Sequence, residues 1–258
     1  MSSTNQKFTA AAFRALHRPG NPLVVTNVYD AATADIASSL PTIKAVATAS
    51  YAIAAAEGVH DDDLTKEQNL AAISKIAKVV VPRGVPLTAD LQDGYEDLAD
   101  TIRRVIALGV VGCNLEDFDS KERKLRSFDE AVSRVNLAVE TAKAAGLPEF
   151  SVNARTDVLG NGGTIADAIE RGKAFLEAGA NTVFVWGGPK GRGVSREEVK
   201  QLVAGLDGRL NVKMGLGEGF LTVPDLRELG VARISVGPGL FTVAMNSFKQ
   251  AAEQILAA

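Results

Sequence analysis

Eight short runs rich in β-branched residues recur along this 258-residue chain, and segments with a helical pattern separate them. The starts of successive runs lie far enough apart to hold a strand, a helix and two loops. Continuous apolar strands between helices are typical of a parallel sheet that is covered on both faces. The runs span residues 22–27, 45–50, 85–92, 110–117, 150–157, 182–187, 210–215 and 233–237.

The segments between the runs carry the start and stop signals of helices. Thr65 is followed three residues later by Gln68, which is the pattern of a capping box, and apolar residues then recur at helical spacing. Two later segments stop at Gly146 and Gly179, as helices commonly do. Eight strands alternating with helices predict an α/β fold of the (β/α)8 TIM-barrel type, with a doubly wound open sheet as the alternative.

The length and the lack of a linker-like stretch predict one barrel domain over residues 1–258. Residues 1–20 form an N-terminal extension whose helix, residues 6–17, is expected to lie at the bottom of the barrel. Residues 239–258 contain a last helix that is apolar on more than one face. That pattern indicates burial against a partner subunit.

Composition excludes several function classes. A formal net charge of −3 offers no basic surface for a nucleic acid. The single cysteine, Cys113, cannot form an internal disulfide, and with two histidines it cannot build a thiolate zinc site. No segment has the apolar core of a secretory signal or the roughly 20 apolar residues of a membrane span. We therefore expect a cytoplasmic protein that binds neither nucleic acid nor membrane.

Polar residues finish three neighbouring runs, where a barrel carries its active site. Asp90 and Gln92 end the third run, Glu116 ends the fourth, and Asn153 and Arg155 end the fifth. Residues two apart share a face, which groups Asp90 with Gln92 and Asn153 with Arg155. Carboxylate and amide oxygens are ligands that Mg²⁺ or Mn²⁺ prefers, and an arginine fork suits a substrate carboxylate.

Not every acid near a strand end indicates chemistry. Asp93, Asp97, Asp117 and Asp129 follow strands or precede helices, where an acid commonly caps a helix. Asp90 differs because it ends an apolar run, where a carboxylate without a partner is costly. Asp90 is therefore the acid for which we most expect a functional role.

Six segments resemble those of the isocitrate lyase and phosphoenolpyruvate mutase superfamily, in its phosphonomutase-like and oxaloacetate decarboxylase-like branch. In order they are "NVYDAATA", "GVHDDDLTKEQ", "TADLQDGY", "CNLEDFD", "NARTD" and "LGVARISVGPGL", and the resemblance covers roughly residues 20–245. It implies a Mg²⁺-dependent lyase or decarboxylase acting on a small α-keto or 2-hydroxy (di)carboxylate through a metal-bound enolate. It also implies homodimers or homotetramers with exchanged C-terminal helices.

The resemblance also assigns residues. It implies a metal site at Asp90, Gln92 and Glu116, where Gln92 stands in the place of a second acid. It gives catalytic roles to Asp61, Arg155 and Glu116. The implied substrate-binding residues are Tyr29, Ala49, Ser50, Tyr51, Asn153 and Arg155, with the backbone amides of the "ASY" turn receiving carboxylate and keto oxygens.

Two departures from the family pattern keep alternatives open. Gln92 removes one negative charge from the metal shell, which predicts weaker Mg²⁺ binding. The loop at residues 117–127 lacks the Cys and His of the true lyases, so cleavage of isocitrate or methylisocitrate by their mechanism is not predicted. The alternatives are an enzyme of phosphorus–carbon bonds, whose phosphoryl group would need the loop cations Lys121, Arg123, Lys124 and Arg126, and an inert, ligand-binding barrel.

Overall fold

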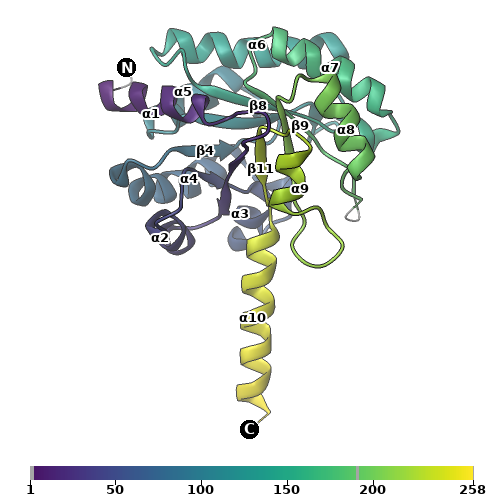
Figure 1. Ribbon diagram of the computed structural model, residues 1–258. Coiled ribbons are helices and arrows are strands. Elements are labelled where there is room, and N and C mark those ends of the chain that lie inside the picture. The colour runs from purple at the N-terminus through teal and green to yellow at the C-terminus, as the bar shows by residue number, and fades with distance from the viewer. Residues whose placement is uncertain (1–2, 190–191, 258) are drawn as a thin grey trace.

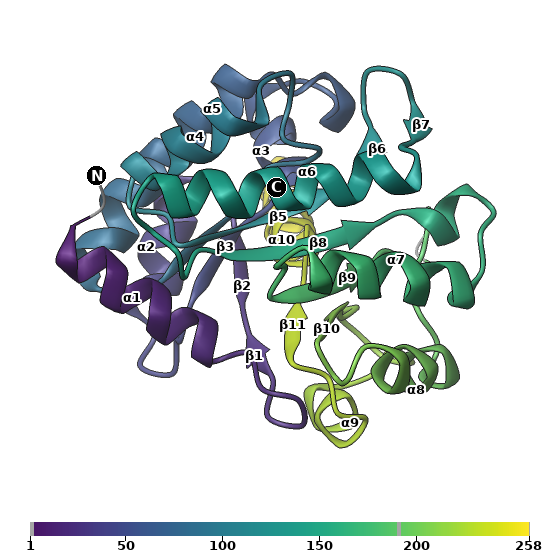
Figure 2. The ribbon, with the colours of Figure 1, turned by 90° about the horizontal axis from the view of Figure 1, so that it is seen from above.

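The computed structural model describes residues 3–189 and 192–257, and its parallel strands form a nearly closed barrel with helices around it (Figures 1 and 2). The order of neighbouring strands is β1-β11-β10-β9-β8-β5-β4-β3-β2. The predicted barrel is therefore confirmed over the open sheet. Its strands are β1 (Leu23–Val24), β2 (Thr26–Val28), β3 (Val46–Thr48), β4 (Leu87–Asp90), β5 (Gly112–Glu116), β8 (Ser151–Thr156), β9 (Thr182–Val185), β10 (Leu210–Lys213) and β11 (Arg233–Ser235).

The first predicted run closes the barrel because it contacts two different strands. It is interrupted at Val25, so that β1 pairs with β11 and β2 pairs with β3. Val25 itself donates a hydrogen bond of 2.9 Å from its backbone N–H to the carbonyl of Ile234. One short segment thus bridges the last strand and the second run, a break that periodicity alone does not predict.

Side-chain caps begin most of the helices. The predicted capping box is confirmed: Gln68 N donates to Thr65 Oγ1 over 3.3 Å, and Thr65 N donates to Gln68 Oε1 over 3.1 Å. Ser, Thr or Asp side chains cap seven others in the same way, each by accepting a backbone N–H of the first turn. The helices are α1 (Thr4–Ala15), α2 (Ala31–Ser39), α3 (Ser50–Glu57), α4 (Lys66–Val80), α5 (Leu98–Ala107), α6 (Phe128–Ala144), α7 (Ile165–Glu177), α8 (Arg196–Gly205), α9 (Val223–Glu228) and α10 (Gly239–Leu256).

The inside of the barrel is unusually polar. Arg233 of β11 reaches Asn114 of β5, two strands that are not neighbours in the sheet, so this 3.5 Å contact crosses the interior. Asn153 donates from Nδ2 to Asn114 Oδ1 over 2.7 Å and accepts from Thr182 Oγ1 over 2.6 Å. Because buried polar groups need partners, these bonds hold β5, β8 and β9 in register below the site.

Helix α1 covers the N-terminal end of the strands, as predicted. Phe13 is completely buried and packs against Gly112, the first residue of β5, where a Cβ would lie 2.9 Å from the phenyl ring. Gln6 donates from Nε2 to the carbonyls of Ile106 and Val110, over 2.8 and 3.2 Å. The helix thereby seals the bottom of the barrel.

Helix α10 extends away from the barrel, as Figure 1 shows. It has no buried residue, and Phe248 and Ile255 are 72% and 75% exposed. At its start, the ring of Phe241 packs edge-on against Tyr29 at 5.1 Å. This exposed apolar surface agrees with burial in an oligomer, and helix exchange stays a prediction. Within the described ranges, no helix is both long and apolar enough to cross a membrane.

Two further strands interrupt the predicted loop at residues 117–127. β6 (Phe118–Asp119) pairs in antiparallel fashion with β7 (Lys124–Leu125) to form a hairpin beside the barrel. Asp119 accepts the backbone N–H groups of Lys121 and Glu122 over 3.0 and 2.8 Å, which stabilises the turn. The segment is therefore an ordered β-hairpin rather than an irregular loop.

The burial of Phe13 generates a test of the seal by α1. Phe13→Ala is expected to lower the free energy of unfolding by about 3–5 kcal/mol, because it leaves a cavity under the barrel. Phe8→Ala, on the same helix but 70% exposed, is the matched control and is expected to change it by less than about 0.5 kcal/mol. Urea denaturation of the two variants measures the difference, and equal losses would contradict this packing.

Candidate active site

A cavity of about 450 Å³ opens at the C-terminal ends of the strands. Strand-end residues from several sides of the barrel form its wall, together with the start of α3 and the loop that follows that helix. A volume of this size suits a small organic molecule. The polar residues in its wall are Asn27, Ser50, Asp61, Asp90, Asn114, Arg155, Arg192, Lys213 and Ser235.

Asp90 is held by its backbone and by one carboxylate oxygen. Its N–H donates to Thr48 Oγ1 over 2.8 Å, and its carbonyl accepts from Asn69 Nδ2 over 3.0 Å. The carboxylate oxygen Oδ2 accepts the backbone N–H of Ser50 over 3.1 Å. No described residue donates to the other oxygen, Oδ1. Asp90 therefore keeps one oxygen for a ligand in the cavity.

Gln92 does not follow the predicted alternation with Asp90. Strand β4 ends at Asp90, and Gln92 has φ +51°, in the left-handed region. Its Nε2 donates to the carbonyl oxygen of Asp61 over 2.8 Å and to Oδ1 of Asp61 over 3.2 Å. Gln92 is absent from the described cavity wall. Its amide thus positions Asp61.

Asp61 lies in the cavity wall, in the single turn Asp61–Asp63. Burial and the nearby charge of Asp90 together raise the pKa of its carboxyl to about 6, while Ser50 and Arg155 act in the opposite direction. Loss of hydration disfavours the charged form of an acid. Asp61 therefore exchanges a proton close to neutral pH.

Arg155 is fully engaged by two acids. Its Nη1 lies 2.7 Å from Glu116 Oε2, and its Nε and Nη2 each donate to the Asp157 carboxylate over 2.6 Å. The guanidinium also lies over the Trp186 ring, 5.0 Å from its centroid. Burial opposes the charge of Arg155, but Asp157 and Glu116 raise its pKa above the usual value. The structure differs here from our expectation, because the fork has no free face for a substrate carboxylate.

Negative charge exceeds positive charge around Arg155. Burial raises the pKa of Glu116 well above its usual value, and the carboxylates of Asp157, Asp90 and Asp61 add to this effect, while Arg155 opposes it. Four acids thus share one arginine. Glu116 itself lies behind Arg155 rather than in the described cavity wall. The excess of carboxylates favours a cation in the cavity.

The backbone amides of the "ASY" turn are only partly available. Ala49 N–H already donates to the carbonyl of Val28 over 3.2 Å, and Ser50 N–H donates to Asp90. Tyr51 N–H, in the first turn of α3, has no hydrogen-bond partner within the described residues. A helix N-terminus favours anionic oxygens. Of the three predicted amides, that of Tyr51 is therefore the one free to receive a ligand oxygen.

Two predicted substrate-binding residues lie outside the described wall. Asn153 is 1% exposed, and its side-chain amide is hydrogen-bonded to Asn114 and Thr182. Tyr29 is 9% exposed and packs against Phe241. Both therefore support the site from behind. Conversely, sequence reasoning missed Asn27, Asn114, Trp186, Arg192, Lys213 and Ser235, although Lys213 and Ser235 end strands and Trp186 follows one.

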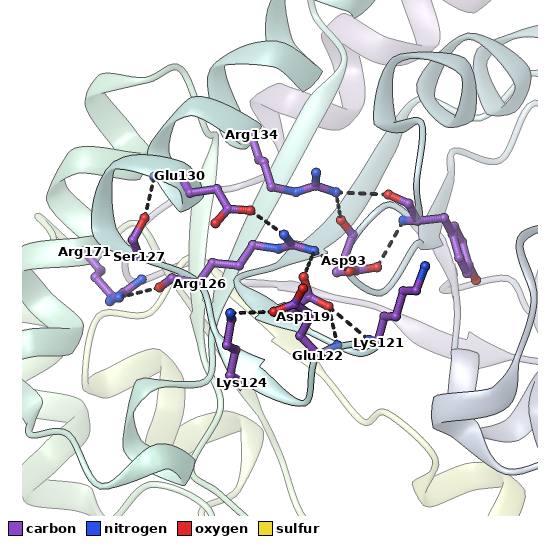
Figure 3. Close-up of polar contacts among 11 residues, drawn as sticks. Asp93, Asp119, Lys121, Glu122, Lys124, Arg126, Ser127, Glu130, Arg134 and Arg171 are labelled. Carbon is purple, nitrogen blue, oxygen red and sulfur yellow. Dashed lines mark hydrogen bonds and ion pairs between the residues drawn. The ribbon is translucent and has the colours of Figure 1, made fainter.

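Arg126, directly after the hairpin, neutralises neighbouring acids, as Figure 3 shows. Arg126 Nη2 lies 2.7 Å from Asp93 and 2.9 Å from Asp119. Arg126 also pairs with Glu130. Asp93 is buried in this cluster, so its predicted capping role is wrong, whereas Asp97 does cap α5.

The other hairpin cations also lie away from the cavity. Arg123 pairs with Asp62 over 2.5 Å, and Lys124 pairs with Glu122 over 2.5 Å. None of the predicted hairpin cations, Lys121 included, belongs to the described wall. The predicted anion-binding role of this loop therefore finds no support in the geometry.

Comparison with known proteins decides the family, because residues 13–256 match the model of the phosphoenolpyruvate phosphomutase family. The chain belongs to this family. The resemblance to the isocitrate lyase and phosphoenolpyruvate mutase superfamily is thereby confirmed, as is the expectation of an enzyme.

Three proteins are similar to this member of the phosphoenolpyruvate phosphomutase family in sequence or structure. A phosphonomutase-like protein from Burkholderia cenocepacia superposes with a TM-score of 0.86, at 32% identity, over 96% of this chain and 99% of that one. The 2,3-dimethylmalate lyase of Eubacterium barkeri is 30% identical over 205 residues, 75% of this chain and 67% of that protein. Oxaloacetate acetylhydrolase with its product oxalate superposes with a TM-score of 0.83, at 26% identity, over 96% of this chain and 87% of that one.

The raised pKa of Asp61 predicts a specific pH dependence of stability. The contribution of the Asp61 carboxyl to the free energy of unfolding is fully present below its pKa in the unfolded chain, near 3.8. This contribution is lost as the pH rises through its folded pKa of about 6. Between pH 4 and pH 7, the wild type should lose about 2–3 kcal/mol of unfolding free energy relative to Asp61→Asn. Urea denaturation in EDTA measures this, with the exposed neighbour Asp63→Asn as control. A difference that stays constant with pH would contradict the burial of the Asp61 carboxyl.

Proposed function

We propose that the chain is a Mg²⁺-dependent carbon–carbon lyase or decarboxylase that acts on a small α-keto or 2-hydroxy carboxylate through an enolate. The observation that carries this proposal is the Asp90 carboxylate, which keeps one oxygen free in a cavity of small-molecule size. The names of two relatives agree with it, since one is a 2,3-dimethylmalate lyase and the other an oxaloacetate acetylhydrolase in complex with its product oxalate.

The donor set in the cavity fits a hard divalent cation. Asp90 would hold it, with an oxygen of Asp61 in the same wall. No described group of three or more acids, cysteines or histidines is arranged to hold a metal alone. Waters and substrate oxygens would therefore complete the coordination, as they commonly do for Mg²⁺, and Mn²⁺ suits the same ligands. When bound, the cation supplies positive charge for an oxygen that becomes negative.

The protein's own groups orient the substrate and move the proton. The free N–H of Tyr51, at the start of α3, donates to a carboxylate or keto oxygen of the substrate. Ser50 N–H holds Asp90 toward the cavity. Asp61, with its pKa near 6, gives a proton to the enolate carbon or takes one from a hydroxyl group.

Arg155 contributes a fixed positive charge. Glu116 and Asp157 hold its guanidinium in one orientation at the cavity wall, so that no reorganisation is needed when charge develops on the substrate. Gln92 holds Asp61 from the side away from the cavity. Glu116 and Gln92 thus act as positioning residues, and Asp90 is the direct metal ligand of this proposal.

An enzyme of phosphorus–carbon bonds is the second candidate, because the Burkholderia cenocepacia relative is phosphonomutase-like. Its phosphoryl group would need cations near the hairpin. Arg123, Lys124 and Arg126 are paired with acids, and all four cations, Lys121 included, lie outside the described cavity wall. The geometry therefore favours the carboxylate lyase.

Turnover tests the proposal directly. Oxaloacetate, alkylated malates and phosphonopyruvate are incubated with the protein and Mg²⁺, and products are followed by absorbance and by phosphorus NMR. We expect turnover of a carboxylate substrate that EDTA abolishes. Asp90→Asn keeps the shape and the acceptor for Ser50 but loses the charge, and it is expected to lower kcat/KM by at least about 100-fold.

Asp97→Asn is the matched control, since asparagine caps a helix as well as aspartate does. It should leave kcat/KM within about twofold. Full activity of Asp90→Asn, or absence of all turnover in a folded protein, would refute the lyase. Turnover of phosphonopyruvate alone would move the assignment to phosphorus–carbon chemistry.

A further inference from the structure

We infer that Lys213 binds a second anionic group at the far end of the substrate, and so selects dicarboxylates over monocarboxylates. This inference rests on the proposed function, because it concerns the same cavity. It starts from a count of the cations that face the cavity. Within residues 3–189 and 192–257 these are Arg155, Arg192 and Lys213.

Two of these cations are already satisfied. Arg155 gives its nitrogens to Glu116 and Asp157. Arg192 pairs with Glu198 over 2.5 Å and donates to the carbonyl of Gly193 over 2.8 Å. A guanidinium whose donors are used within the protein gains little from a ligand. Neither arginine therefore offers a fresh site for a substrate carboxylate.

Lys213 is different because its ammonium group has no hydrogen-bond or ion-pair partner among the described residues. It ends strand β10, lines the cavity and is exposed to solvent. Burial lowers the pKa of Lys213, and the charge of Arg155 lowers it further. An anion beside the ammonium group would offset both costs.

The backbone around Lys213 leaves room for its long side chain. A Cβ on Gly237 would lie 3.2 Å from Cε and 3.3 Å from Cδ of Lys213. Gly237 has φ +52°, and its N–H donates to Asn27 Oδ1 over 3.0 Å, as does the N–H of Val236 over 3.1 Å. The lysine side chain thus lies along a glycine whose position is fixed by Asn27.

The position of Lys213 in the barrel sets the geometry of the ligand. In the closed strand order, β10 and β4 lie on opposite sides, with the same number of runs between them in either direction. Lys213 and Asp90 therefore face the cavity from opposite walls. A substrate whose keto acid end lies at Asp90 and α3 points its other end toward Lys213. An acid group at that end would pair with the ammonium.

Binding of two probes separates this inference from the proposed function. Oxalate occupies only the Asp90 end, whereas 3,3-difluorooxaloacetate adds a distal carboxylate and resists cleavage of its carbon chain. Both are titrated by calorimetry in Mg²⁺. Lys213→Met, which keeps the length of the side chain, is expected to weaken difluorooxaloacetate about 10- to 100-fold and oxalate less than about twofold.

Lys213→Arg is expected to keep difluorooxaloacetate binding within about threefold, because the charge remains. Lys75→Met, on the exposed side of α4, is the matched control and should change neither probe. Equal weakening of both probes, or of neither, by Lys213→Met would overturn the inference. Absence of oxalate binding to the wild type would instead refute the proposed function. Unchanged oxalate binding also shows that the variant site is folded.

A covalent role for Lys213 would likewise overturn the inference. A neutral lysine can attack a keto group and form an imine, with loss of water, and borohydride then reduces the imine to a stable amine. We expect no mass increase when wild-type protein is treated with oxaloacetate and borohydride. A trapped adduct on Lys213 would show that the residue acts as a nucleophile rather than as an anion-binding cation.

Discussion

The paired contacts of Arg155 organise the top of the barrel. Strands β5 and β8 lie side by side with Glu116 opposite Arg155, so the ion pair follows directly from their register. Asp157, two residues beyond, completes the contact. A buried arginine is costly unless acids and hydrogen bonds surround it, and here they do. The strand register thereby fixes a charged group at the cavity wall, and Asp157, just beyond β8, adds a second carboxylate to it.

This arrangement determines how the other charges in the cavity are used. Because Glu116 and Asp157 occupy the nitrogens of Arg155, the wall near Asp90 has an excess of carboxylates. Lys213, on the opposite wall, is the cation without an ion-pair partner among the described residues. A cavity with opposite charges at its two ends orients a small dicarboxylate before close contacts form. The polar interior below it, held by Asn114 and Asn153, keeps the strand ends from shifting.

The sequence predicted the features that depend on periodicity and on neighbours in the chain. These include the eight runs, the capping box at Thr65 and the position of Asp90 at a strand end. It did not predict features that depend on distant partners or on a single backbone angle. The positive φ of Gln92 directs its side-chain amide toward Asp61. The ion pairs of Arg126 with Asp93 and of Arg155 with Glu116 join residues that are far apart in the sequence. Lys213 was missed because the predicted run extended over residues 210–215, whereas strand β10 ends at Lys213.

Gln92 shows why a charge can be absent without loss of the site. Its Nε2 donates to both the carbonyl oxygen and the carboxylate of Asp61. A carboxylate at position 92 has no N–H to donate, so its oxygens would face the carbonyl oxygen and the carboxylate of Asp61 without a hydrogen bond. Leaving such buried groups unpaired costs about 1–3 kcal/mol. A carboxylate would also add a negative charge near Asp61, Asp90 and Glu116, where burial and then neighbouring carboxylates already raise the pKa of Glu116 and of Asp61. With Asp61 turned into the cavity, a neutral donor is therefore the side chain that this position requires.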